Sequence, residues 1–389
     1  MYDFDSVVDR RNTGTHKWAF APEPLAKKSI LPLSIADMEF KMAPAIQEAL
    51  HCAVEHGICG YTVIDDAYFE AVAAWMLRRH GFAVKREWLC CTPGVVSALG
   101  IAVRAFTQKG DGIIIQPPVY PPFWAAVRDN KRELLENRLI YDNGKYTMDY
   151  DNLEKLCARP STKLMILCSP HNPVGRVWSV DELTRLGDIC RRHGVIIVVD
   201  EIHQDVMLPG NTHTVFSTID GMADNCITCT AVSKTFNLAG LCCSNIFIQN
   251  EKLREKFKIV QERDSTMGIP FYARAASIAA YTDCDAWVNE MLEYVNKNFE
   301  FMYDFIDTRL PQVKCIRAQG TFLAWTDMRA LGLGDDAAQE NFMVNKGLLA
   351  LDEGYIFGTG GNGFERWNIA LPRTGLEEAL LRLERAIKE

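Results

Sequence analysis

Three polar residues in the middle of the chain each follow a run of apolar residues. Asn172 lies in the turn Ser169-Pro-His-Asn-Pro-Val-Gly175, Asp200 follows five aliphatic residues, and Lys234 stands between Ser233 and Thr235 after a further apolar run. A carboxylate at the end of a buried strand requires a cation or a hydrogen-bond donor. A lysine among small and apolar neighbours can lose its solvent and act as a nucleophile or a base. Lys234 is therefore a candidate nucleophile or base, and Asp200 is a candidate partner for a protonated group.

Each residue also has a structural interpretation. The turn that contains Asn172 could serve only to reverse the chain. Asp200 could cap a helix or form an internal salt bridge, and most lysines are solvated surface groups. The order of the three residues, each just beyond an expected strand, favours a shared site, because open α/β sheets bind their ligands at the carboxyl ends of their strands.

A fourth feature lies earlier in the chain. The segment Cys91-Thr-Pro-Gly-Val-Val-Ser97 opens a helical pattern that runs to Phe106. Backbone N–H groups at the start of a helix bind anions without a basic side chain. The start of this helix is therefore a candidate anion site.

The elements that position these residues alternate between strands and helices. Continuous apolar runs over 112–116, 163–168 and 194–199 predict strands covered on both faces. A helix is expected over 180–193, opened by Ser179 and ended by Gly194. Strand, helix and strand in succession predict an α/β fold with a mostly parallel central sheet.

The two ends of the chain have a different pattern. Residues 45–55 are expected to form a linker helix after an irregular N-terminal arm, and residues 287–310 and 376–388 have amphipathic helical patterns. We therefore expect a large domain over 46–284 and a smaller α+β domain formed by 1–45 together with 285–389.

Composition excludes several classes of function. The 389 residues carry a net charge of −8, which offers no basic surface for nucleic acid or for an anionic membrane. The N-terminus is acidic and no apolar run is long enough to cross a bilayer, so a cytoplasmic protein is expected. The 13 scattered cysteines are interpreted as reduced thiols. A metal cluster of His51, Cys52, His56 and Cys59 lacks a second ligand pair at zinc-like spacing, and no metal is expected.

The motifs in their order resemble a known family. The chain is similar to the MalY/PatB-type cystathionine β-lyases, carbon–sulfur lyases with the aspartate-aminotransferase-like fold of pyridoxal-phosphate (PLP) fold type I. The resemblance covers nearly the whole chain. Its motifs include Asp3-Phe-Asp5, Lys17-Trp18, Ile35-Ala-Asp-Met38, Gly60-Tyr-Thr62, Thr92-Pro-Gly-Val-Val96, Pro118-Val-Tyr-Pro-Pro-Phe123, His171-Asn-Pro-Val-Gly175, Asp200-Glu-Ile-His203, Ser233-Lys-Thr-Phe-Asn237 and Leu371-Pro-Arg373.

The resemblance implies roles around the cofactor ring. Lys234 would bind PLP as a Schiff base, and Asp200 would keep the pyridine nitrogen protonated. Asn172 would donate a hydrogen bond to the phenolic oxygen and contribute to substrate binding. Tyr120 would stack on the ring, and His203 would support Asp200. An ordinary packed aromatic and a core histidine are the alternatives for the last two.

The resemblance also implies a phosphate site and a dimer. The N–H groups of Val95 and Val96 and the hydroxyl of Ser233 would bind the phosphate. Aminotransferases carry an arginine eight residues after the lysine, where this chain has Cys242. Tyr61 from a neighbouring subunit would replace part of that role, so the resemblance implies a homodimer with shared active sites.

The implied reaction is an α,β-elimination from L-cystathionine or a related cysteine S-conjugate, giving a thiol, pyruvate and ammonia. Arg373 is the candidate for the substrate α-carboxylate, because guanidinium binds carboxylate through paired hydrogen bonds; the backbone at Ala36 would close over the same group. Transamination with the same cofactor is the main alternative. The second alternative is a binding protein in which the cofactor site is vestigial.

Overall fold

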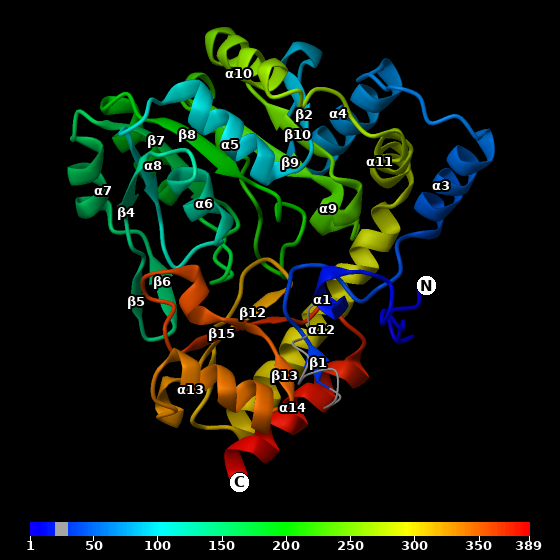
Figure 1. The fold of residues 1–389 in the computed structure, drawn as a ribbon, viewed down its shortest axis with the longest axis vertical. Helices are drawn as coiled ribbons and strands as arrows, with labels where there is room; N and C mark the ends of the chain where they lie inside the picture. Colours follow the sequence, from blue (N-terminus) through cyan, green and yellow to red (C-terminus); the bar gives the residue numbers. More distant parts are fainter. Residues whose placement is uncertain (20–29) are drawn as a thin grey trace.

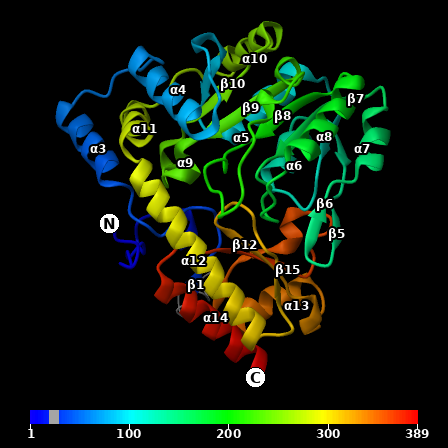
Figure 2. The ribbon, with the colours of Figure 1, turned by 180° about the vertical axis from the view of Figure 1, so that it is seen from behind.

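The computed structural model describes residues 1–19 and 30–389. The chain forms two units, which lie one above the other in Figure 1. A seven-stranded sheet lies in the upper unit and a four-stranded sheet in the lower one. Helix α12 (Asp285–Arg309) runs from the upper unit into the lower unit, as Figure 2 shows from behind.

The large sheet has the strand order β2-β10-β9-β8-β7-β3-β4. Strand β10 is antiparallel to both of its neighbours, and the remaining pairs are parallel. The predicted mostly parallel α/β sheet is therefore confirmed. Its strands are β2 (Leu89–Thr92), β3 (Gly112–Ile115), β4 (Glu133–Glu136), β7 (Thr162–Cys168), β8 (Ile196–Asp200), β9 (Cys226–Ala231) and β10 (Ser244–Phe247).

Apolar residues that follow one another along these strands enter two different cores. Met165 and Leu167 of β7 pack into the core that contains α7 (Tyr150–Cys157) and α8 (Val180–Arg192). Leu164 and Ile166 pack into the core on the opposite face, with α5 (Val95–Phe106), α6 (Pro122–Arg128) and α10 (Glu251–Arg263). Because side chains alternate along a strand, a continuous apolar run is what two covered faces require.

The predicted limits of helix α8 agree with local chemistry. Ser179 Oγ accepts a hydrogen bond from the Glu182 N–H at 3.2 Å, and Glu182 Oε2 accepts one from the Ser179 N–H at 2.9 Å. This reciprocal pair is a capping box. Gly194, beyond the helix, has a φ of 68°, and strand β8 begins at Ile196 rather than at the expected Gly194.

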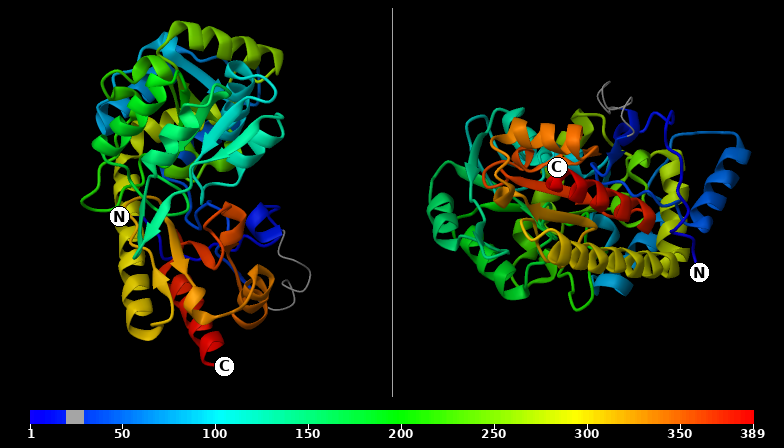
Figure 3. Two further views of the ribbon diagram at one scale, coloured as in Figure 1. Left: turned by 90° about the vertical axis from the view of Figure 1, so that its left-hand side faces the viewer. Right: turned by 90° about the horizontal axis from the view of Figure 1, so that it is seen from below.

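The lower unit contains an antiparallel sheet in the order β11-β12-β15-β14. Its strands are β11 (Lys314–Cys315), β12 (Leu323–Asp327), β14 (Asp352–Glu353) and β15 (Phe364–Asn368). Helices α12 and α14 (Arg373–Lys388) run side by side along this unit, as Figure 3 shows from below. Strand β1 (Leu31–Pro32) pairs in parallel with β13 (Leu349–Ala350), which joins the beginning of the chain to its last quarter.

The remaining elements are short or lie at the side of the upper unit. Helices α3, α4 and α11 pack together beside the large sheet. The bounds are α1 (His16–Ala19), α3 (Pro44–His56), α4 (Asp66–His80), α9 (Val232–Thr235), α11 (Phe271–Asp283), α13 (Asp336–Asn341), β5 (Ile140–Asp142) and β6 (Lys145–Thr147).

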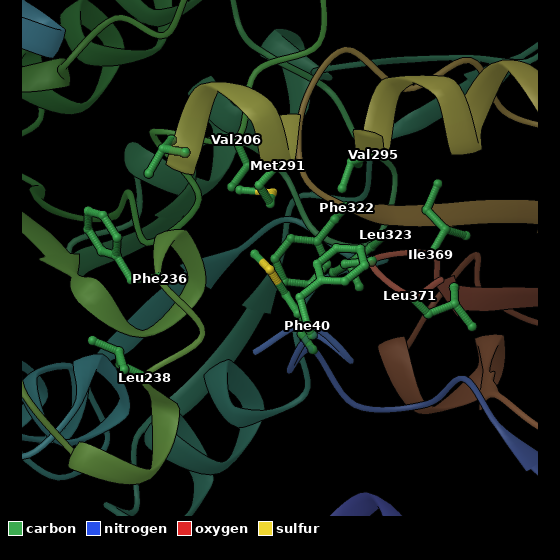
Figure 4. Close-up of a cluster of buried hydrophobic side chains, with 14 of the residues drawn as sticks. Phe40, Val206, Phe236, Leu238, Met291, Val295, Phe322, Leu323, Ile369 and Leu371 are labelled. Carbon is green, nitrogen blue, oxygen red and sulfur yellow. The ribbon is translucent and has the colours of Figure 1, made fainter. Parts of the chain in front are cut away.

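A buried apolar cluster connects the two units. Met291 and Val295 of α12 lie near Phe322 and Leu323, while Phe236 belongs to the loop that follows α9 (Figure 4). All five side chains are at most 1 % exposed. Burial of this size stabilises each side chain by roughly 1.5–3 kcal/mol, so the contact fixes the two units against each other.

Two further observations concern the whole described chain. Within residues 1–19 and 30–389, no helix has the length and apolar character needed to cross a membrane. All 13 cysteines are free thiols, and the exposed ones are Cys52, Cys59 and Cys242.

Candidate active site

The carboxyl edge of the large sheet brings the three central residues together. Asn172 follows β7, Asp200 is the last residue of β8, and Lys234 lies in α9 directly after β9. These strands are adjacent and parallel, so their carboxyl ends meet at one edge. The residues line one cavity of about 200 Å³.

Nine of the predicted site residues line this cavity. They are Ala36, Val95, Val96, Tyr120, Asn172, Asp200, His203, Ser233 and Lys234. Two predicted residues do not line it: Tyr61, whose side chain is fully exposed on the surface, and Arg373.

Lys234 lines the cavity and is half-buried. Its Nζ donates a hydrogen bond to the Ala36 carbonyl oxygen at 2.7 Å. Burial, reinforced by the nearby positive charge of Arg366, lowers the pKa of Lys234 to about 8. An amine with such a pKa is available in its neutral, nucleophilic form near neutral pH.

The short helix that carries Lys234 is anchored from behind. Thr235 Oγ1 donates to Asp205 Oδ2 at 2.7 Å, and Asp205 Oδ1 lies 2.7 Å from His80 Nε2. Trp75 Nε1 donates to the same Asp205 oxygen at 3.1 Å. These buried contacts restrict how far α9 can move, and they hold the lysine at the strand end.

Asp200 is a buried carboxylate that no ion pair within the described residues neutralises. Its Oδ1 accepts a hydrogen bond from the Ile202 N–H at 3.1 Å. Burial raises the pKa of Asp200 to about 7, and the Ile202 hydrogen bond and Lys234 oppose that rise. A ligand with a protonated nitrogen would supply the missing positive partner.

The start of α5 offers N–H groups to the same cavity. Gly94 is the N-cap residue with a φ of 95°, and no side chain caps the helix. The first turn, with Val95 and Val96, therefore has free N–H groups, which favour an anion. Ser233 and Cys242 also line the cavity.

The segment over residues 35–38 closes one side of the cavity. Asn237 Oδ1 accepts from the Met38 N–H at 2.9 Å, and Asn237 Nδ2 donates to the Met38 oxygen at 3.0 Å. Asn368 Nδ2 donates to the oxygens of Ile35 and Asp37 at 2.7 and 2.6 Å. Side chains from both units therefore hold the carbonyl of Ala36 against Lys234.

Arg366 is a candidate site residue that the sequence analysis missed. It lies within β15, it is 4 % exposed, and its Nη1 donates to Asn172 Oδ1 at 3.0 Å. A charged residue between Glu365 and Trp367 in a fully buried strand is a signal that could have identified it, because such a charge requires partners.

Of the predicted residues Arg373 and His203, only His203 lines the cavity. Arg373 is the first residue of α14; its Nε donates to Asn298 Oδ1 at 2.8 Å, and its guanidinium lies over the Phe301 ring. His203 is buried in the cavity wall beside Phe322, and its Nδ1 has no hydrogen-bond partner among the described residues. Burial lowers the pKa of His203, so the ring is neutral.

Residues 28–383 match the family model described as aminotransferase class I and II. The chain belongs to this family. Relatives within the class I and II aminotransferases include cystathionine beta-lyase PatB of Bacillus subtilis, which is 42% identical over 99% of this chain and 100% of its own length. Protein MalY of Escherichia coli is 32% identical over 100% of this chain and 99% of its own.

A solved structure of the same family has nearly the same fold. The crystal structure of cystalysin from Treponema denticola, which contains a pyridoxal 5'-phosphate cofactor, superimposes with a TM-score of 0.96 at 41% identity. The alignment covers 100% of this chain and 99% of that one. The predicted aspartate-aminotransferase-like fold is thereby confirmed, together with the resemblance to MalY and PatB.

Proposed function

We propose that the protein is a PLP-dependent carbon–sulfur β-lyase that converts L-cystathionine, or a related cysteine S-conjugate, and water into a thiol, pyruvate and ammonia. The observation that carries this proposal is the half-buried Lys234 amine in one cavity with the buried Asp200 carboxylate, which has no ion-pair partner among the described residues. Relatives that cover the full chain are named cystathionine beta-lyases, which supports the same reaction class.

The residues of the cavity fit PLP. Asp200 lacks a cation and would hold the proton on the pyridine nitrogen. The uncapped start of α5, with Val95 and Val96, and the Ser233 hydroxyl would bind the phosphate. Lys234 Nζ would hold the cofactor covalently. When bound, PLP withdraws electrons from the substrate Cα and stabilises the negative charge that forms there.

Lys234 acts as the base in this proposal. Its pKa of about 8 leaves a useful fraction of neutral amine near neutral pH, and that amine takes the proton from the substrate Cα. The Ala36 carbonyl orients the amine through the 2.7 Å hydrogen bond. Loss of the β-thiolate completes the elimination, and water then converts the remaining three-carbon unit into pyruvate and ammonia.

We infer that Arg366, rather than Arg373, binds the substrate α-carboxylate. Arg366 donates to Asn172, which lines the cavity, and its charge acts on Lys234. Neither arginine lines the cavity itself, but the partner of Arg373 is Asn298, which does not line the cavity either. A guanidinium that reads a carboxylate must face the site with unused N–H groups.

A homodimer with shared sites is part of the proposal. Several apolar residues within ten positions of Tyr61 in the sequence are exposed, namely Val54, Ile58 and Val63. Clustered apolar exposure of this kind marks an interaction surface. Tyr61 would then complete the phosphate site of the partner subunit.

The division into domains and the cellular compartment are also part of the proposal. A large domain over 46–284 and a small domain over 1–45 with 285–389 are supported by the pairing of β1 with β13. A reducing compartment such as the cytoplasm is supported by the free thiols, including the buried neighbours Cys157 and Cys190, whose sulfur atoms are 4.0 Å apart.

Purified protein loaded with PLP tests the function directly. L-cystathionine alone should yield equal amounts of thiol and pyruvate, measured with a thiol-reactive dye and a coupled pyruvate assay. Turnover that occurs only after a keto acid is added would identify an aminotransferase and refute the lyase. Absence of a Lys234-dependent absorption band would instead support a binding protein with a vestigial site.

A further inference from the structure

We propose that Asp352 is a positioning residue that links recognition of the substrate carboxylate to the catalytic lysine. The inference rests on the proposed function, because it takes Arg366 as the carboxylate-binding group. A single carboxylate oxygen, Asp352 Oδ2, accepts hydrogen bonds from Arg366 Nη2 at 2.5 Å and from the Ile35 N–H at 2.9 Å.

The first contact fixes the guanidinium. Strand register places Asp352 directly opposite Arg366, and their side chains are 14 % and 4 % exposed. Asn172 Oδ1 accepts from Arg366 Nη1 on the other side, and the ring of Phe357 lies beneath the guanidinium. With both nitrogens held, the remaining N–H groups of Arg366 keep one orientation toward an incoming carboxylate.

The second contact fixes the segment that meets Lys234. Ile35 has a φ of 55°, a left-handed conformation that is unfavourable for a β-branched residue. Such a conformation persists only when neighbours hold it, and Asp352 binds its N–H while Asn368 binds its carbonyl. The next carbonyl, that of Ala36, accepts the hydrogen bond from Lys234.

Charge connects the same groups. The positive charges of Arg366 and Lys17 lower the pKa of Lys234, while the carboxylates of Asp37 and Asp200 raise it. Because Asp352 is ion-paired with Arg366, its carboxylate would offset part of the field of that guanidinium. Neutralising Asp352 while keeping its shape should therefore lower the pKa of the lysine. Asp352 thus influences the amine through both the backbone and the field.

The test compares Asp352→Ala, Asp352→Asn and the control Glu353→Gln in PLP-loaded protein. Glu353 is the neighbouring residue in the two-residue strand β14; it pairs with Glu365 and not with Arg366. Because burial raises the pKa of Glu353 to about 7, its substitution removes the same charge above that pH. The probe is L-alanine, which has the shared carboxylate and amine but no leaving group.

Two quantities are measured from the visible absorption of the cofactor: the dissociation constant of L-alanine, and the pH midpoint of the lysine-bound form. We expect weaker L-alanine binding, by about tenfold in Asp352→Ala and about threefold in Asp352→Asn. In both variants the midpoint should fall by about half a pH unit. Glu353→Gln should change neither.

Three results would overturn the link: an unchanged dissociation constant in both variants, an unchanged midpoint in both, or the same changes in Glu353→Gln. If Asp352→Ala does not fold, Asp352→Asn decides by the same criteria. Failure of the proposed function is separable, because a protein that binds L-alanine but releases no thiol from cystathionine would refute the lyase and leave this comparison intact.

Discussion

On the large-sheet side of the cavity, Asn172, Asp200 and Lys234 each stand at or just beyond a strand end. On the small-sheet side, Arg366 lies inside β15, and Ala36 lies in an irregular segment that side chains from distant parts of the chain hold in place. The first side is assembled by consecutive strands and helices. The second side is assembled by contacts between residues hundreds of positions apart.

Sequence patterns therefore carry more information about the large-sheet side of the site than about the small-sheet side. A parallel sheet places all its strand ends on one edge, so a polar residue after an apolar run is already positioned. An antiparallel strand in a small unit gives no such rule, and a motif such as Leu371-Pro-Arg373 can draw attention to an arginine that donates to Asn298 instead. Four substitutions, with one matched control, test the different contributions of the two sides of the cavity.

Lys234→Ala should have the largest effect. Removal of the base should lower the rate of thiol release by about ten-thousandfold. The visible absorption band of the lysine-bound cofactor should also disappear, because no lysine remains at this position to bind it. Circular dichroism serves as the control for folding. A residual rate within tenfold of the unaltered protein would show that the large-sheet side does not carry the base.

Arg366→Ala should lower kcat/KM by about a thousandfold, because two charge-assisted hydrogen bonds to the carboxylate are lost. Arg373→Ala is the matched variant and should change kcat/KM by less than about threefold. Steady-state rates with L-cystathionine compare them. A larger loss of kcat/KM in Arg373→Ala than in Arg366→Ala would restore the sequence-based assignment of Arg373. It would also contradict a role for β15 of the small sheet in substrate binding.

Asp200→Asn should stabilise the cofactor-free protein at high pH. Burial raises the pKa of Asp200 from 3.8 to about 7, so the folded state binds a proton more tightly than the unfolded state. The resulting cost is absent below about pH 4 and complete above pH 7, where it amounts to about 4 kcal/mol. Urea unfolding across pH 4 to 8.5 measures the difference. A stability gain that did not grow with pH would indicate that Asp200 is already neutralised in the protein.

Ser179→Ala should have the smallest effect and touches only local structure on the large-sheet side. Loss of the capping box of α8 should lower the free energy of unfolding by about 1 kcal/mol. KM and kcat should stay unchanged, because Ser179 does not line the cavity. Urea unfolding and steady-state rates check both parts. A changed KM would show that the outer helices of the sheet influence the site.

The predictable part of the protein follows from local patterns. Strands β7 and β8 and the cap of α8 were expected because burial on two faces and helix capping leave short-range signatures. Asp200 stands at the end of β8, and Lys234 directly follows β9, so local patterns located both residues, while the family resemblance implied their roles. Arg366 and Asp352 were missed, because their meaning depends on strand register within the small sheet.

The fold family, the mostly parallel sheet and the residue types at its carboxyl edge can be predicted from the amino-acid sequence, because hydrophobic period, element order and motifs are properties of neighbouring residues. Only the tertiary structure decided which arginine adjoins Asn172, which carbonyl receives Lys234, and how Asp352 connects the two. These contacts form where β14 and β15 meet the segment over 35–38, which lies more than 300 positions earlier in the chain. Close packing of two units, rather than any local preference, sets such contacts.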